Sequence, residues 1–182
     1  IRSGSGETTN ETPQDIAVAA ADWTWLGIPI DTDAEFFTTR LSLTSAAPGL
    51  LIDYALLVAG PWTPPAAGEA RPLPANLFSH AGAIDQAAGG VCLQAERDPA
   101  DIVFYGPLLP VEPGRYRVTF DYTSPAAAGT VLGDLSARVE RDPVAARPVA
   151  AGAPARLEFD ITKNLPLRID FRYARTGDLV IR

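Results

Sequence analysis

The chain has 182 residues, with 15 basic and 22 acidic side chains and a formal net charge of −7 at pH 7. Nucleic acids and anionic membranes bind basic patches, so this charge argues against both as partners and is compatible with a neutral polymer. Apolar residues make up 47% of the sequence. A chain of this length can bury roughly 70% of its unfolded surface, so we expect a folded domain rather than disorder.

Cysteine content and apolar runs constrain the compartment only in part. Cys92 is the only cysteine, so no internal disulfide is expected. No apolar run reaches the roughly 18 residues that a membrane span requires, so insertion into a membrane is not expected. The sequence contains no methionine, which suggests that Ile1 lies inside a longer protein. A cell-envelope location is favoured, with the cytoplasmic face of the membrane as the alternative.

The first part of the chain divides by composition. Residues 1–14 are polar and rich in Thr, Ser and Gly, which is typical of a flexible leader or a linker remnant. Strands are expected at 36–44 and 50–58, so residues 15–60 are interpreted as an N-terminal β subdomain, a half-sandwich or the end of a preceding module. Five prolines in residues 61–75 predict an extended connection.

The clearest strand pattern lies at 115–122, where apolar side chains occupy every second position. This period of two places Tyr116, Val118, Phe120 and Tyr122 on one face of the strand. The same alternation recurs at 157–161 and 167–173, where Arg168, Asp170 and Arg172 fall on the polar face. Further strands are expected at 91–95, 101–106, 130–139 and 179–181.

These patterns predict an all-β fold. Clean alternation means that one face of each strand is buried and the other is wet, which is typical of antiparallel sheets. Many short strands separated by turns indicate a sandwich or barrel. The 17 prolines and 15 glycines are scattered and leave little room for helices. We therefore expect an antiparallel β-sandwich of jelly-roll type, with helix limited to short turns.

The sequence offers few residues and no motif that would support catalysis. His80 is the only histidine, no Gly-x-Ser-x-Gly elbow occurs, and one His with one Cys cannot supply the three or four ligands of a zinc site. We therefore expect a domain without enzymatic activity and without a cofactor. The alternative is a glycan-cleaving enzyme with two loop carboxylates. The default interpretation is that the loop and strand-end aspartates are solvated turn residues: Asp31, Asp33, Asp98, Asp101 and Asp134. A structural calcium ion bound by loop oxygens stays open, with no assignable ligands.

Residues 102–120, which include Tyr105-Gly106-Pro107 and Pro113-Gly114-Arg115-Tyr116, resemble the signature of small sandwich modules in bacterial glycosyltransferases, methyltransferases and other surface-polysaccharide proteins. The resemblance covers residues 76–182 and implies a carbohydrate-binding-module-like sandwich that has no activity of its own. Where the family usually has a second aromatic residue, this chain has Leu108. We expect Gly106-Pro107 to end one strand with a forced bend and Pro113-Gly114 to begin the next.

The sequence therefore predicts a non-catalytic, carbohydrate-binding accessory domain of a larger bacterial polysaccharide-synthesis or cell-envelope protein. A purely structural or assembly module is the main alternative. Its partners would be a polysaccharide and other domains of the parent protein. A sugar stacks its apolar face on an aromatic ring, so the candidate platform is Trp62, held in the proline-rich connection, followed by Trp25 and Tyr105. His80 and Arg97 are candidate partners for the sugar hydroxyls.

Overall fold

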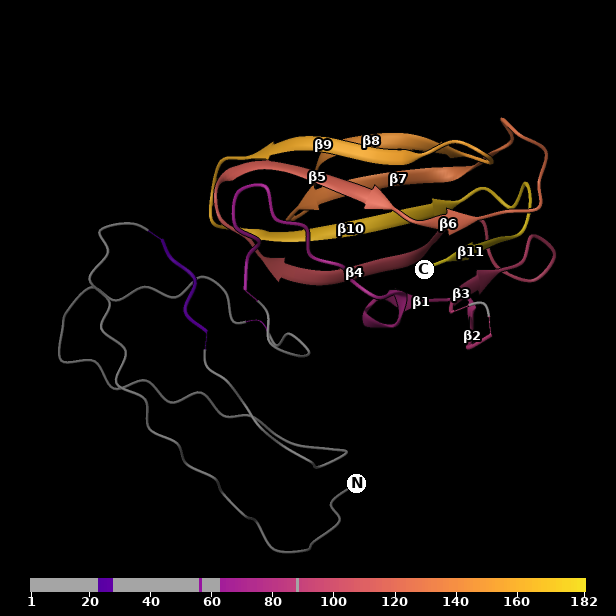
Figure 1. Cartoon of the computed structure of the whole chain (residues 1–182), viewed down its shortest axis with the longest axis horizontal. Coiled ribbons are helices and arrows are strands. Elements are labelled where there is room, and N and C mark those ends of the chain that lie inside the picture. The colour runs from indigo at the N-terminus through magenta and orange to yellow at the C-terminus, as the bar shows by residue number, and fades with distance from the viewer. Residues whose placement is uncertain (1–22, 28–55, 57–62, 88) are drawn as a thin grey trace, which may run out of the picture.

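The computed structural model describes residues 23–27, 56, 63–87 and 89–182 (Figure 1). Most of the N-terminal unit expected at 15–60 lies outside the described residues. This includes the strand expected at 36–44 and, apart from Leu56, the strand expected at 50–58. Trp62, the leading sugar-binding candidate, also lies outside them.

The regular secondary structure in the described part of the chain is almost entirely β, as the sequence predicts. Its one helical element is a single 3-10 turn, η1 (Ala75–Leu77). No helix in this part is long and apolar enough to cross a membrane. The strands are β1 (Ser79–His80), β2 (Ala83–Asp85), β3 (Gly90–Leu93), β4 (Ile102–Pro110), β5 (Gly114–Phe120), β6 (Tyr122–Thr123), β7 (Val131–Val139), β8 (Asp142–Ala150), β9 (Ala155–Ile161), β10 (Pro166–Tyr173) and β11 (Leu179–Ile181).

The strands form two antiparallel layers (Figure 1). One layer is a five-stranded sheet in the order β1-β4-β10-β7-β8. The other combines the sheet β2-β3-β11-β6 with the pair β5-β9. Only Asp121 separates β5 from β6, so the two continue one another: β5 pairs with β9 and β6 pairs with β11. The fold is therefore an antiparallel, jelly-roll-like β-sandwich.

Aromatic rings join the two layers. Phe120 on β5 packs on Phe171 of β10, with ring centroids 5.2 Å apart, and meets Phe104 of β4 edge-on at 6.1 Å. Phe104 in turn stacks on Phe78 at 4.4 Å. Burying each such ring contributes about 1.5–3 kcal/mol, so this ladder is a main source of stability.

β10 is the central strand of the five-stranded sheet and shows the expected alternation. It pairs with β4 on one side and β7 on the other. Leu167, Ile169, Phe171 and Tyr173 are all buried and face the core, which we call the inner face. The opposite side of the sheet, called the outer face here, carries Arg168, Asp170 and Arg172.

β8 is a nine-residue edge strand that the sequence pattern did not predict. Its sequence, Asp-Pro-Val-Ala-Ala-Arg-Pro-Val-Ala, contains two prolines and mostly small side chains. Such a composition is typical of a loop, but proline is tolerated at a sheet edge because the outward N–H needs no partner strand. β8 pairs with β7 along its length, from Val131↔Ala150 to Val139↔Asp142.

Candidate functional site

A bulge in β4 shapes the outer face of the five-stranded sheet. Leu167 of β10 pairs with Leu109 of β4, but Ile169 pairs with Gly106, so two β4 residues lie opposite one β10 residue. Gly106 has φ +96°, a conformation that glycine adopts without strain. The expectation that Gly106-Pro107 ends a strand was therefore wrong. The extra residue re-aims the chain within one continuous strand, whereas the next strand does begin at Gly114 as expected.

The bulge turns two β4 side chains outward. Tyr105 is 40% exposed and Leu108 is 45% exposed, although residues three apart on a regular strand point to opposite faces. Leu108 holds the position at which the resembling modules usually have a second aromatic residue. It lies on the same outer face as Tyr105, so an aromatic residue there would have extended the exposed ring surface.

Tyr105 lies against a cation. The guanidinium carbon of Arg168 is 4.8 Å from the centre of the Tyr105 ring, which is within cation–π range. The Nε of Arg168 donates to Oδ1 of Asp170 at 2.5 Å. The ring, the guanidinium and the carboxylate therefore form one connected unit across β4 and β10.

Asp170 is buried although its position on β10 points outward. Its side chain is only 2% exposed, and its Oδ2 has no hydrogen-bond partner in the described part of the chain. The Nε of Arg138 on β7 lies 3.9 Å from that oxygen, which is ion-pair range rather than hydrogen-bond range. Two guanidinium groups thus share one carboxylate. We call Tyr105, Leu108, Arg138, Arg168 and Asp170 the Tyr105 cluster.

Strand register surrounds the Tyr105 cluster with small polar and apolar residues. Ser79 of β1 pairs with Tyr105, which pairs with Asp170, which pairs with Ser136 of β7. Ser136 in turn pairs with Ala146 of β8. The row crosses all five strands, so hydroxyl groups stand on both sides of the ring and the carboxylate.

The residues that the sequence singled out are not brought together. Tyr105 belongs to the cluster. Trp25 is half-buried, and its indole Nε1 donates to the carbonyl of Val111 at 2.9 Å, beyond the end of β4. His80 on β1 is also half-buried, and its Nδ1 lies 2.8 Å from the carbonyl oxygen of Gly82.

Arg97 closes a loop between β3 and β4. Its Nε donates to Oδ1 of Asp98 at 2.9 Å and its terminal nitrogen to Oδ2 at 2.8 Å, while the backbone N–H of Gln94 also donates to Asp98. The hydrogen bonds from Arg97 are the main cause that lowers the pKa of Asp98. Asp98 is 4% exposed, so its interpretation as a solvated turn residue was wrong. Asp101, in contrast, is exposed and pairs with Arg172 at 3.4 Å.

Sequence reasoning missed Arg138, Arg168 and Asp170 as site residues. The sequence does hold a signal for two of them: on the polar face of 167–173, Asp170 lies between Arg168 and Arg172, each two residues away. Only the pairing of β10 with β4 and β7 places Tyr105 and Arg138 beside that carboxylate.

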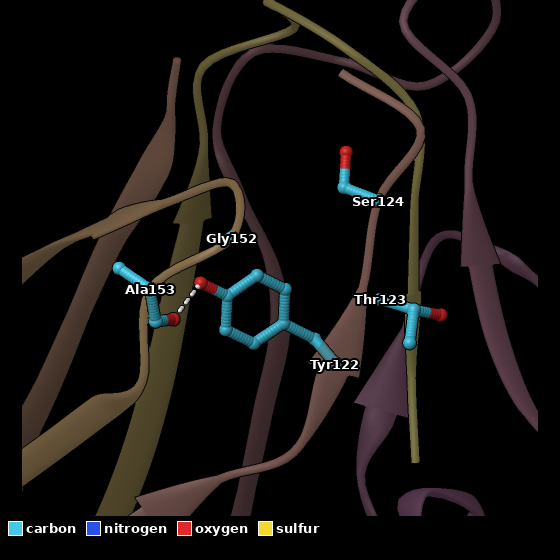
Figure 2. Close-up of a pocket in the computed structure, with 5 residues that line it drawn as sticks. All are labelled: Tyr122, Thr123, Ser124, Gly152 and Ala153. Carbon is cyan, nitrogen blue, oxygen red and sulfur yellow. Dashed lines mark hydrogen bonds between the residues drawn. The ribbon is translucent and has the colours of Figure 1, made fainter. Parts of the chain in front are cut away.

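A second feature is a shallow cavity of about 320 Å³ between β6 and the β8–β9 turn (Figure 2). Tyr122 reaches across to this turn, and its hydroxyl oxygen lies 2.6 Å from the carbonyl oxygens of both Ala150 and Ala153. A phenol has one proton, so it donates to one carbonyl at a time. Ser124 donates to the carbonyl of Asp178. Both hydroxyls form hydrogen bonds with main-chain carbonyls, and none of the described residues that line the cavity is charged.

Among the described residues, no group of three or more His, Cys, Asp or Glu side chains is placed to hold a metal ion. The structural calcium ion stays a prediction without assigned ligands. The chain matched no protein-family model, no curated protein and no solved structure.

Proposed function

We propose that this chain is a non-catalytic, carbohydrate-binding accessory domain of a larger bacterial polysaccharide-synthesis or cell-envelope protein, and that the Tyr105 cluster is its binding surface. The observation that carries the proposal is the exposed Tyr105 ring on the outer face of a sheet. The β-bulge next to Tyr105 directs the ring outward, and Arg168 lies against it. The likeness of residues 76–182 to sandwich modules of surface-polysaccharide proteins agrees with it.

Tyr105 has the properties that a sugar platform needs. A pyranose presents an apolar C–H face that gains contact and sheds water when it lies on an aromatic ring. Tyr105 is 40% exposed, so part of the ring surface is free for such contact. Because Arg168 already lies against the ring, little side-chain entropy is lost when a sugar binds.

The surroundings supply partners for sugar hydroxyls. Ser79 and Ser136 flank the Tyr105–Asp170 pair in the strand register. One carboxylate oxygen of Asp170 has no hydrogen-bond partner among the described residues, and buried polar atoms of this kind are uncommon in folded proteins.

The expected affinity is weak. One exposed ring and a few hydroxyl partners correspond to dissociation constants from micromolar to millimolar, or roughly −8 to −4 kcal/mol. Several sites on the parent protein would raise the working affinity through avidity.

The test is an NMR titration of the isotope-labelled chain with soluble fragments of bacterial surface polysaccharides. Resonances of Tyr105, Leu108 and Arg168 should shift together. Tyr105→Ala should weaken binding at least about tenfold, or about 1.4 kcal/mol. The control is Trp23→Ala, which removes another ring, 54% exposed but outside the cluster, and should leave the affinity within about twofold.

Variants of the other candidate residues complete the test. Trp62→Ala and Trp25→Ala examine the sequence prediction that these rings bind sugar, and Trp62 must be tested because it lies outside the described residues. If millimolar fragments shift no resonance of the chain, the structural or assembly module becomes the better interpretation. Hydrolysis of a fragment that stops after a single Asp→Asn change would favour the glycan-cleaving enzyme.

A further inference from the structure

We infer that the Tyr105 cluster selects glycans that carry carboxylate groups, the uronic acids, over neutral glycans. This inference rests on the proposed function and names its ligand class. Its starting point is the charge count of the cluster. Two guanidinium groups, on Arg138 and Arg168, are balanced by one carboxylate, on Asp170. The cluster therefore holds a surplus of one positive charge.

The acidic net charge of the chain does not oppose an acidic ligand at this place. Residues 1–62 contain 2 basic and 8 acidic side chains, whereas residues 63–182 contain 13 basic and 14 acidic side chains. The sandwich by itself is close to neutral, so its local surplus decides which charge is attracted. The net charge of −7 disfavours anionic partners, but most of that charge lies in residues 1–62. The argument therefore does not apply to the outer face of the sandwich.

Arg168 is partly exposed and uses only one of its guanidinium nitrogens in a hydrogen bond with the described residues. Its Nε is engaged with Asp170, but its two terminal nitrogens have no hydrogen-bond acceptor among the described residues. The side chain is 34% exposed. Arginine presents these donors as a planar fork that fits a carboxylate with two parallel hydrogen bonds. The terminal nitrogens of Arg168 can therefore donate to the carboxylate of a ligand.

Ring and fork are close enough to act on one sugar residue. The guanidinium carbon lies over the Tyr105 ring, 4.8 Å from its centre, so the guanidinium covers one face of the ring and a sugar packs on the part of the ring that stays exposed. The exposed part of the ring and the guanidinium are neighbours, so both lie within reach of one sugar residue. A uronic acid bears one carboxylate on each ring, and its single negative charge matches the surplus of one positive charge. A sulfate or phosphate substituent is the competing anion, because arginine also forms paired hydrogen bonds with those groups.

The experiment compares acidic oligosaccharides with neutral forms of the same backbone. The probes are oligogalacturonate, alginate oligosaccharides and glucuronate-containing oligosaccharides, each also after chemical reduction of its carboxyl groups, together with a sulfated oligosaccharide. We expect at least one uronate to bind about tenfold or more tightly than its reduced form. The preference should shrink near 1 M salt, where the Debye length falls to about 3 Å.

Variants locate the preference. Arg168→Gln should remove the preference, so that the acidic and reduced forms bind this variant with dissociation constants within about twofold of each other, whatever its affinity for both. Arg168→Lys keeps the charge but loses the fork, so it should keep only part of the preference. Arg172→Gln is the matched control, because it removes the same charge from the same strand but outside the cluster. An NMR fingerprint of each variant checks that it is folded.

The outcomes separate this inference from the proposed function. Equal binding of acidic and reduced forms, with both lost in Tyr105→Ala, overturns the uronate preference and leaves carbohydrate binding intact. Stronger binding of the sulfated probe than of every uronate also overturns it. Failure of every probe to bind at millimolar concentration overturns both.

Discussion

The inner and outer faces of β10 alternate within eight residues but are built differently. On the inner face, Leu167, Ile169, Phe171 and Tyr173 are each at most 4% exposed and contact other apolar groups. On the outer face, the Arg168 and Arg172 side chains are 34% and 56% exposed, yet Asp170 between them is buried at 2%. The inner face thus gains stability from buried area. The outer face keeps a desolvated charge, which is a costly arrangement unless it is paired.

The largest expected effect lies on the inner face. Phe171 is fully buried and stacks on Phe120 of the opposite layer at 5.2 Å. Phe171→Ala removes that contact and leaves a cavity, which should lower the free energy of unfolding by about 3–5 kcal/mol. Chemical denaturation followed by tryptophan fluorescence or circular dichroism measures it. A loss below about 1 kcal/mol would mean that the two layers do not pack through this ring.

A pH effect of intermediate size is expected from Tyr173 on the same face. Burial raises the pKa of Tyr173 to about 12, and the hydroxyl donates to the carbonyl of Gly177 at 2.8 Å. The unfolded chain loses this proton near pH 10, before the folded chain does. Stability from this group is therefore complete below about pH 10 and is lost as the pH rises through 12, by about 2–3 kcal/mol in total.

Tyr173→Phe isolates this effect. The variant has no phenol to titrate, so its free energy of unfolding should fall less steeply between pH 10 and pH 12 than that of the parent chain. Urea unfolding at several alkaline pH values gives both curves. Because burial also raises the pKa values of Tyr116 and Tyr122, only the difference between the curves is assigned to Tyr173. Parallel curves would contradict the prediction.

The smallest effect is expected one residue from Phe171, on the outer face. Arg172 pairs with Asp101 at 3.4 Å, and the two side chains are 56% and 69% exposed. Exposed pairs of this kind contribute about 0–1 kcal/mol, so Arg172→Ala should leave the free energy of unfolding nearly unchanged. The same denaturation assay applies. A loss comparable to that of Phe171→Ala would erase the contrast between the two faces.

Strands with strict alternation could be predicted from the sequence, and the edge strand could not. β9 and β10 show apolar residues at every second position, and one buried face follows directly from that period. β8 lacks the pattern because an edge strand in this sandwich buries little: eight of its nine residues are exposed or half-buried, and only Val149 is buried. Its pairing with β7 is set by the partner strand rather than by its own side chains.

The candidate site was foreseen at one residue. Tyr105 was named from the sequence, but the sequence pattern did not show whether its side chain points into the core or outward. The bulge at Gly106 shifts the register of β4, and Tyr105 lies on the outer face. Trp25 and Arg97 were named for chemistry that their neighbours already use, since Val111 accepts from the indole and Asp98 from the guanidinium. Whether a polar group already has a hydrogen-bond partner within the protein depends on the folded structure, and in the case of Trp25 on a segment 86 residues away. The sequence pattern around each residue does not predict it.

The sequence by itself determined the fold class, because the period of apolar residues is a local property that each antiparallel strand carries. It also determined the inner face of β10, down to the individual residues. Only the tertiary structure decided that Tyr105, Arg138, Arg168 and Asp170 meet on one outer surface, because three strands contribute to it and their register arises from pairing across the sheet. The burial of Asp170 has the same origin in part, because its carboxylate lies near Arg138 of the neighbouring strand β7 as well as Arg168 of its own strand.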